Sequence, residues 1–442
     1  MQTSFTLVQL ADPDIAAADK ILRACVHCGF CTATCPTYVM LGDELDSPRG
    51  RIYLIKDMLE NDRPATADVV PHLDRCLSCL SCMTTCPSGV HYMHLIDHAR
   101  AHVEETFRRP VIDRAVRAVI ARLLPNPKLF RRSLLGAFFM KPLAPLFDAI
   151  GLKPLAAMLR LAPAKVPPRG EQGPRVFPAQ GERRGRVALL TGCVASVVAP
   201  HINAATIRVL TRHGVEVVLA EGEACCGALV HHMGRQAAAL AAARTNVDAW
   251  IAEIDGEGID SILVTASGCG TTIKDYGYML RNDPAYATKA KTVSGLARDV
   301  SEYVNKIINL TTVPHPSLVV AYHAACSLQH GQRVRDEPKR LLAAAGFTVL
   351  DIPEGHMCCG SAGTYSMLQP DLADALRRRK VGQVESTRPD VVASGNIGCI
   401  AHIGAATALP VLHTVELLDW ATGGPEPEAL SASGRSAATA AR

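Results

Sequence analysis

The sequence predicts an α+β protein with several domains, in which a mainly helical amino-terminal domain precedes two duplicated α/β units with mostly parallel sheets. Three observations support this prediction. The chain has 442 residues, which is enough for several domains of ordinary size. Helix signals surround two dense runs of cysteine near its start. From residue 186 onward, short apolar runs alternate with helical segments, and the same order occurs twice.

The predicted organisation has five parts, which differ in composition. They are a cysteine-rich domain at 1–107, a basic helical connector and linker at 108–180, a first α/β repeat at 181–310, a second repeat at 311–422 and a disordered tail at 423–442. Many prolines divide the connector into short helices. Ala, Ser, Gly, Pro and Glu dominate the tail, and this composition is typical of disorder.

Two helices are expected around the first cysteine run. A short helix over 14–23 leads directly to Cys25. Ser47 followed by Pro48 is typical of an N-cap and the first residue of a helix. Apolar residues then recur at helical spacing, so a second helix is expected over 48–60.

Each repeat is predicted to contain three strands, and each strand leads to cysteine. The strands cover residues 186–190, 215–219, 261–265, 318–322, 348–352 and 391–394. Helices over 203–212 and 235–253 fill the intervals of the first repeat. A single cysteine, a Cys-Cys-Gly triplet and a last cysteine follow the three strands in turn. Matching cysteines lie 133, 133 and 130 residues apart, which indicates an internal duplication.

The chain contains 16 cysteines, and their spacing predicts metal binding rather than disulfides. Its first twenty residues carry three aspartates and no apolar core of a secretory signal, which indicates a reducing, cytoplasmic setting. Eight cysteines form two runs of the type C-x2-C-x2-C-x3-C-P. The runs are Cys25, Cys28, Cys31 and Cys35 with Pro36, and Cys76, Cys79, Cys82 and Cys86 with Pro87.

Runs of this type hold [4Fe-4S] clusters in bacterial dicluster ferredoxins, where the fourth cysteine of each run binds the other cluster. The prediction is therefore two [4Fe-4S] clusters. One is on Cys25, Cys28, Cys31 and Cys86, and the other is on Cys76, Cys79, Cys82 and Cys35. Structural zinc is the alternative, but zinc knuckles leave the third and fourth cysteines of each run unexplained. Such clusters pass single electrons and bind no substrate, so no catalytic residue is assigned. Positive charge from Arg49, Arg51 and Arg75 is a hypothesis for tuning their potentials.

The other eight cysteines form two looser sets, one in each repeat. The sets are Cys193, Cys225, Cys226 and Cys269, and Cys326, Cys358, Cys359 and Cys399. Because loops at the carboxyl ends of parallel strands meet at one edge of a sheet, each set is expected to gather round one redox or metal site. Gly227 and Gly360 would let the backbone approach that site closely. Ordinary buried cysteines are the alternative.

Positive charge is concentrated between residues 108 and 169, where thirteen Lys and Arg accompany two acids. This pattern favours an anionic partner, such as a membrane surface or an acidic subunit, with a solvated connector as the alternative. The apolar contacts would come from Phe130, Leu134, Phe138, Phe139 and Met140. No run reaches the ~18 apolar residues of a membrane span. The segment lacks a recognition-helix motif or an aromatic stacking pattern, which argues against nucleic acid as a partner.

The paired Cys…Cys-Cys-Gly…Cys pattern resembles the cysteine-rich (CCG) domain of heterodisulfide reductase, of the anaerobic glycerol-3-phosphate dehydrogenase iron–sulfur subunit and of lactate-utilisation proteins. In the heterodisulfide reductase relatives the last cysteine belongs to a C-x-x-C pair, and the motif can hold a non-cubane [4Fe-4S] cluster. Here Thr272 and His402 stand at the place of the second cysteine. A further iron–sulfur cluster at a CCG site, with His402 replacing a thiolate, stays open beside an ordinary core or surface histidine.

Longer stretches resemble the iron–sulfur subunit of bacterial glycolate oxidase. They lie at residues 21–38, 42–56, 85–90, 203–206 and 265–270. The resemblance implies an electron-transfer subunit of glycolate dehydrogenase. Partner subunits that bind flavin would oxidise glycolate to glyoxylate, and this chain would pass the electrons toward a quinone or another membrane acceptor. The resemblance also implies a cytoplasmic protein that is peripheral on the inner membrane through its complex.

No glycine-rich dinucleotide fingerprint follows a predicted strand, so neither flavin nor NAD is expected on this chain. Two alternatives stay open. Because the substrate would lie on another chain, the complex could act on lactate, glycerol 3-phosphate or another 2-hydroxy acid. Alternatively, the CCG sites could themselves reduce a disulfide or a quinone, as heterodisulfide reductase does. Iron content tests the second alternative, since two cubanes contain about eight irons and occupied CCG sites would add to them.

Overall fold

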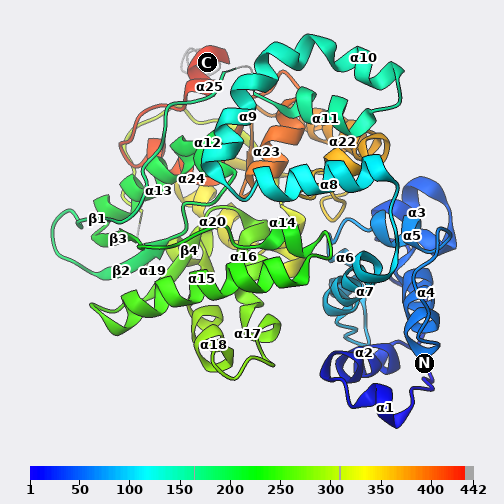
Figure 1. The fold of residues 1–442 in the computed structure, drawn as a ribbon. Coiled ribbons are helices and arrows are strands. Elements are labelled where there is room, and N and C mark those ends of the chain that lie inside the picture. Colours follow the sequence, from blue (N-terminus) through cyan, green and yellow to red (C-terminus); the bar gives the residue numbers. More distant parts are fainter. Residues whose placement is uncertain (164, 308–309, 434–442) are drawn as a thin grey trace.

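The computed structural model of the chain describes residues 1–163, 165–307 and 310–433. It has an amino-terminal group of helices beside two α/β units, and a helical connector that runs along those units (Figure 1). The predicted α+β class, with a helical first region and two α/β repeats, is confirmed.

The amino-terminal region contains short helices separated by the two cysteine runs. They are α1 (Leu7–Leu10), α2 (Pro13–Ala24), α3 (Pro36–Leu41), α4 (Pro48–Glu60), α5 (Val70–Asp74), α6 (Ser81–Thr85) and α7 (Tyr92–Thr106), with a 3-10 turn at Glu44–Asp46. The predicted start of α4 is confirmed, because the Ser47 hydroxyl accepts a hydrogen bond of 3.0 Å from the Gly50 amide and Pro48 occupies the first turn. Buried faces of α2, α4 and α7 form one apolar core with Cys25, Cys76 and Cys82.

The connector is a run of four helices. They are α8 (Val111–Leu123), α9 (Pro127–Met140), α10 (Ala144–Ala149) and α11 (Lys153–Leu161), with a 3-10 turn at Lys141–Leu143. Leu134 is buried against Ala162 and Val197, and Phe130 packs beside it. The expectation that Leu134 faces a partner is therefore wrong, because it attaches α9 to the first α/β unit, whereas Phe130 is partly exposed. Phe138 and Phe139 are exposed, as expected for a contact surface.

The first α/β unit is built on a five-stranded sheet with the order β1-β3-β2-β4-β5. The strands are β1 (Arg175–Phe177), β2 (Gly185–Leu189), β3 (Val215–Leu219), β4 (Ser261–Val264) and β5 (Ala297–Asp299). The pairs within β2 to β5 are parallel, and β1 is antiparallel to β3. The helices are α12 (Ala195–Val198), α13 (Pro200–Arg212), α14 (Ala228–His231), α15 (Gln236–Asp255), α16 (Ser267–Lys274), α17 (Tyr276–Met279), α18 (Ala287–Leu296) and α19 (Val300–Ile307).

The second unit repeats this plan with a four-stranded, fully parallel sheet of order β7-β6-β8-β9. The strands are β6 (Val319–His323), β7 (Thr348–Asp351), β8 (Val391–Ser394) and β9 (Val411–His413). The other elements are a π-helical turn η3 (Ser327–Gly331), α20 (Glu337–Ala344), α21 (Tyr365–Leu368), α22 (Pro370–Ser386), α23 (Ile397–Gly404), α24 (Thr414–Ala421) and α25 (Glu428–Ser433).

The two α/β units share one hydrophobic core, which combines side chains of both sheets with those of α13, α20 and α24. The buried carboxylate of Asp419 on α24 adds an ionic contact, because it lies 2.6 Å from Nη2 of Arg208 and 3.2 Å from Nη2 of Arg212 on α13. The repeats are therefore packed as a pair.

Three strands and one helix differ from the sequence prediction. β1, β5 and β9 were not predicted, because three residues are too few to show the alternation that marks a strand. The tail prediction is wrong at Glu428–Ser433, where α25 forms and buries Leu430 in the shared core. Residues 434–442, the end of the predicted disordered tail, lie outside the described residues.

Candidate iron–sulfur and CCG sites

The two cysteine runs share one backbone conformation. Cys25 caps the end of α2, and His27 and Gly29 then have φ angles of 60° and 85°. Ser78 and Leu80 occupy the same two places of the second run, with φ angles of 49° and 62°. Left-handed residues at alternate positions turn successive N–H groups inward, which is the arrangement of backbone nests that bind iron–sulfur clusters. The sequence did not reveal this, because three of the four residues are not glycine.

The predicted ligands of the first cluster lie round a single pocket. Cys25, Cys28, Cys31 and Cys86 all line it, and Cys82 does so as well. Cys86 reaches the pocket because it ends α6, which the fold places against the first run. Cys28 is exposed, whereas Cys25 is buried. The structure thus brings together the four cysteines of the crossed set.

The predicted ligands of the second cluster are more deeply placed. Cys35, Cys76 and Cys82 are buried, and Cys79 is partly buried. Burial raises the pKa of the Cys82 thiol well above its usual range, and the nearby thiols of Cys79, Cys76 and Cys35 raise it further. Burial, followed by the neighbouring Cys25 thiol, likewise raises the pKa of Cys31 to about 11. Iron binding at these positions would therefore release protons from the thiols. The ligand assignment itself stays a prediction.

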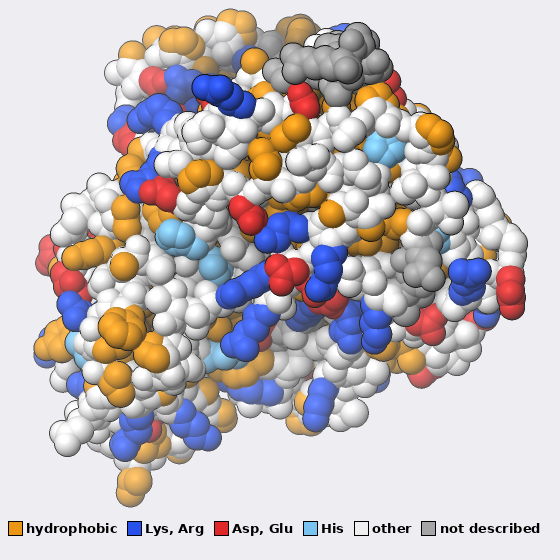
Figure 2. Space-filling view, turned by 180° about the vertical axis from the view of Figure 1, so that it is seen from behind, with side chains coloured by type: hydrophobic (Ala, Val, Ile, Leu, Met, Phe, Trp, Pro, Cys, Tyr) orange, Lys and Arg blue, Asp and Glu red, His pale blue; other side chains and the backbone are white. Residues whose placement is uncertain are grey.

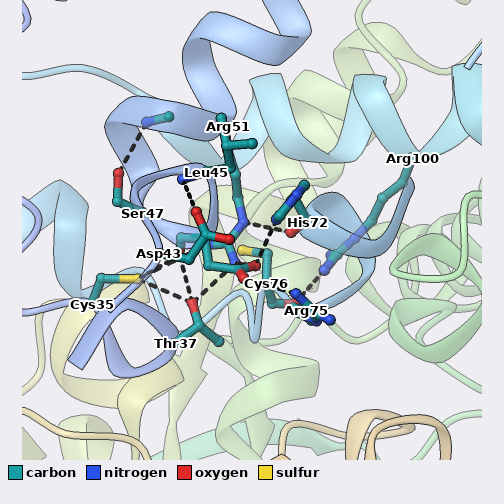
Figure 3. Close-up of polar contacts among 12 residues, drawn as sticks. Cys35, Thr37, Asp43, Leu45, Ser47, Arg51, His72, Arg75, Cys76 and Arg100 are labelled. Atoms are coloured by element: carbon teal, nitrogen blue, oxygen red, sulfur yellow. Dashed lines mark hydrogen bonds and ion pairs between the residues drawn. The ribbon is translucent and has the colours of Figure 1, made fainter. Parts of the chain in front are cut away.

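A buried arginine lies beside the second set (Figure 3). Nη1 of Arg51 donates to Sγ of Cys35 at 3.8 Å, and its Nε donates to the backbone carbonyl of His72 at 2.6 Å. Its Nη2 lies 3.3 Å from the Asp46 carboxylate, and both side chains are almost fully buried. Arg75 pairs with the same carboxylate at 2.9 Å. Of the three arginines in the tuning hypothesis, Arg51 therefore contacts a predicted ligand sulfur directly.

In the first α/β unit, the four cysteines of the repeat follow β2, β3 and β4, as predicted. Sγ of Cys225 lies 3.4 Å from Sγ of Cys193. The adjacent thiols of Cys193 and then Cys226 lower the pKa of Cys225, whereas the pKa of Cys226 is raised by its contacts with the Cys225 and Cys269 thiols. Tyr276 donates a hydrogen bond of 2.8 Å to the Cys226 carbonyl. The set is gathered at the carboxyl edge of the sheet.

In the second unit, the cysteines gather in the same way, and a histidine joins them. Gly360 N–H donates to Sγ of Cys358 at 3.4 Å, and the Asn396 amide donates to Sγ of Cys399 at 3.3 Å. His323 has a ring nitrogen that lies with the Cys359 and Cys399 sulfurs in a group whose ligand atoms are all within 4.8 Å of one another. Sequence reasoning missed His323. The available signal was its position at the end of a strand, three residues before Cys326.

The Cys-Cys-Gly glycines have a different role from the one expected. Gly227 and Gly360 have φ angles of 83° and 92°, and an added Cβ would lie 3.1 Å from the Ala239 carbonyl oxygen and 2.5 Å from that of Ala373. These contacts are with α15 and α22. The close approach that glycine permits here is between the cysteine turn and the following helix. The prediction had instead been an approach between the cysteine turn and a redox site.

His402, the residue considered as a replacement thiolate, is buried in α23, with Nε2 3.3 Å from the Ala373 carbonyl oxygen. It is not a member of the group formed by His323, Cys359 and Cys399. At the matching place of the first repeat, the Thr272 hydroxyl donates to the Gly268 carbonyl at 3.3 Å. Both side chains thus bond to backbone within their own repeat.

The amino-terminal region is attached to the first α/β unit by an ionic contact. The carboxylate of Asp97 on α7 lies 3.3 Å from Nε2 of His231 and 3.3 Å from Nδ1 of His232. Burial alone would lower the pKa of His231, but the Asp97 charge outweighs it and raises the pKa. The contact fixes α7, which follows the second cysteine run, against α14.

Known proteins share these features. Residues 24–90 match the 4Fe-4S dicluster domain, and residues 187–274 and 320–404 match the cysteine-rich domain of the CCG type. The glycolate oxidase iron-sulfur subunit of Escherichia coli is 43% identical over 95% of this chain and 99% of the relative. A probable glycolate oxidase iron-sulfur subunit of Bacillus subtilis is 29% identical over 91% of this chain and 94% of the relative.

Two further matches are more distant. Lactate utilization protein A of Bacillus licheniformis is 25% identical over 53% of this chain and 99% of the relative. A crystal structure of a hypothetical protein from Helicobacter pylori has a TM-score of 0.51 at 11% identity, and the match covers 95% of this chain and 74% of that one. At this identity the structural match supports the fold alone.

The cysteine sites and these domains together define an iron–sulfur protein with a 4Fe-4S dicluster domain and two CCG domains. More narrowly, the chain belongs to the family of glycolate oxidase iron-sulfur subunits. A 4Fe-4S domain supports electron transfer, and membership of this family implies a subunit of an oxidoreductase complex. Among the residues that the structure covers, we find no helix long and apolar enough to cross a membrane.

Proposed function

We propose that this chain carries electrons in a complex that oxidises glycolate to glyoxylate, through two [4Fe-4S] clusters. Cys25, Cys28, Cys31 and Cys86 hold one cluster, and Cys76, Cys79, Cys82 and Cys35 hold the other. The observation that carries the proposal is that Cys86 of the second run lines the same pocket as Cys25, Cys28 and Cys31 of the first, with Cys82 of the other set beside them. Thiolates in two such sets are the donors that [4Fe-4S] clusters require, and these clusters supply single-electron transfer.

The exposure of the cysteines supports a different neighbour for each of the two cluster sites. Cys28 is exposed, and its neighbours Val26 and Phe30 expose 66% and 64% of their surfaces. An apolar rim round an accessible cysteine fits a protein partner. Cys79 instead lies within the protein and packs against the cluster of buried side chains that contains Cys326 and Cys358. We therefore assign the first set to contact with a partner subunit and the second to contact with the second CCG repeat.

The partner in this proposal is a flavin-binding subunit that removes hydride from glycolate, and the acceptor is a quinone or another membrane carrier. Support comes from the family to which the chain belongs. Neither flavin nor NAD is assigned to this chain.

The test is whether glycolate reduces the purified chain under anaerobic conditions. Reduction is measured as the loss of the visible iron–sulfur absorbance. We expect no reduction by the isolated chain and rapid reduction after its co-purified partner subunits are added. Turnover of glycolate by the isolated chain would contradict the proposal. The match to lactate utilization proteins makes lactate the second candidate substrate. Parallel reactions of the complex with lactate and glycerol 3-phosphate separate these candidates, since the specific substrate reduces the complex fastest.

We also propose that α9 and α10 attach the complex to an anionic membrane surface. Phe138 and Phe139 expose 60% and 79% of their surfaces, and Leu146 and Ile150 are exposed nearby. Figure 2 shows hydrophobic side chains together with Lys and Arg at the upper left of the view, where α10 lies. The connector carries thirteen basic residues and two acids between residues 108 and 169. Exposed aromatic residues among cations are typical of interfacial helices that bind acidic lipids.

Replacing both Phe138 and Phe139 by serine is expected to weaken binding to vesicles that contain phosphatidylglycerol at least tenfold, because the apolar contact is lost. High salt should release the unmodified chain, and vesicles of phosphatidylcholine alone should bind it poorly. The matched control is Val176→Ser, an exposed apolar residue on β1. Co-sedimentation measures all three proteins. Salt-independent binding, or equal binding by the double variant, would exclude this surface as the attachment site.

A further inference from the structure

A buried position three residues before the first cysteine differs in chemistry between the two CCG repeats. His323 ends β6, three residues before Cys326, and the residue at the same place before Cys193 is Leu190. Leu190 is 2% exposed and belongs to the hydrophobic core of the first unit. His323 is 1% exposed. The duplication has therefore placed an imidazole in the second repeat where the first repeat has a core leucine.

The imidazole of His323 has an unused polar atom. Its Nε2 is buried, and it has no hydrogen-bond partner among the described residues. An unpaired buried nitrogen costs free energy, so such a group calls for an explanation. A ligand that accepts the nitrogen lone pair would satisfy it.

The sulfurs of Cys359 and Cys399 lie beside the His323 imidazole. The three ligand atoms are all within 4.8 Å of one another, and all three residues are buried. Ligands of one tetrahedral zinc ion, at 2.0–2.3 Å from the metal, lie about 3.5–4 Å apart. The observed spacing thus suits a single ion. Among the described residues, neither of the two groups that meet this spacing contains a cysteine of the first repeat.

Other groups round the site suit bound thiolates. Asn396 donates to the Cys399 sulfur at 3.3 Å. The buried Lys380 ammonium donates to the Glu354 carbonyl at 2.9 Å and lies within electrostatic reach of Cys326, Cys358 and Cys359. A cation and an amide N–H beside sulfur stabilise the anionic form that a metal requires.

We propose that the second CCG repeat binds one divalent transition-metal ion, zinc or iron, through a ring nitrogen of His323 and the thiolates of Cys359 and Cys399. One imidazole and two thiolates are typical ligands of both ions. The two thiols release their protons to solvent when the ion binds. Within the described part of the first repeat, no such group of ligands is found. This inference goes beyond the proposed electron transfer and does not depend on it.

The test compares the metal content of the full-length chain with that of two variants. His323→Leu reproduces the residue of the first repeat, and His402→Leu is the matched control, a buried histidine outside the group. We expect the unmodified chain to contain one zinc or iron beyond the irons of the two clusters. His323→Leu should lose that ion, and His402→Leu should keep it. Mass spectrometry of zinc and iron tells which metal is bound, and the cluster EPR signals show whether each variant is folded.

A third variant separates a ligand from a packing role. His323→Cys supplies a different ligand atom, so it should retain the ion, with one nitrogen neighbour replaced by sulfur in X-ray absorption spectra. An unmodified chain without the additional ion would overturn the inference, and so would retention of the ion by His323→Leu. An unmodified chain that holds the additional ion but contains no [4Fe-4S] cluster would instead contradict the proposed function.

Discussion

The double replacement of Cys28 and Cys86 by alanine is expected to leave one intact [4Fe-4S] cluster, whereas replacement of Cys79 and Cys86 should leave none. The reason is the crossed geometry, in which Cys86 lies round the same pocket as Cys28 although it belongs to the run of Cys79. Iron content should fall from about eight per chain to about four in the first variant and to near zero in the second. Iron analysis and EPR of the reduced chain measure the difference.

The two variants serve as controls for each other. Each removes two thiols, both lack Cys86, and they differ only in whether Cys28 or Cys79 is also replaced. If each run held its own cluster, the result would be reversed, with Cys79→Ala/Cys86→Ala retaining a cluster. Circular dichroism of both variants checks that the helices have formed. Electron transfer from glycolate in the assembled complex should be lost in both variants, because the loss of even one cluster interrupts the route.

Replacing Arg51 by methionine is expected to lower the reduction potential of the cluster on Cys35 and to destabilise the protein. Arg51 is a buried cation that contacts Sγ of Cys35 at 3.8 Å, so its loss makes the negative charge of the reduced cluster less favourable. It also leaves the buried Asp46 carboxylate without one partner, which typically costs about 3–5 kcal/mol. We expect a potential shift of tens of millivolts in a redox titration monitored by EPR, together with a lower urea midpoint.

Arg75 provides the control, since it pairs with the same carboxylate at 2.9 Å and its side chain is 35% exposed. Arg75→Gln should cost less than about 1 kcal/mol and shift the potential less, because water screens its charge. Arg51→Lys keeps the charge and should recover more of the potential than of the stability. An unchanged potential in Arg51→Met would show that this guanidinium does not tune the cluster.

Much of the fold could be predicted from the sequence because the signals are local. Ser47 and Pro48 define the start of α4 through a cap and a fixed φ, and these depend only on neighbouring residues. The six predicted strands begin and end within one residue of β2, β3, β4, β6, β7 and β8, because short apolar runs between turns are a strong local pattern. By contrast, β1, β5 and β9 exist only through pairing with a neighbouring strand.

The sequence also showed the two cysteine runs and the two CCG sets, since spacing between cysteines is a property of the chain. Tertiary structure decided what surrounds them. Arg51 contacts Cys35 because α4 packs beside the end of the first run, and Cys79 packs near Cys326 because the second repeat folds back on the amino-terminal region. His323 joins Cys359 and Cys399 only when β6, β7 and β8 lie side by side. Contacts between residues distant in sequence depend on how layers pack, and no local pattern encodes that packing.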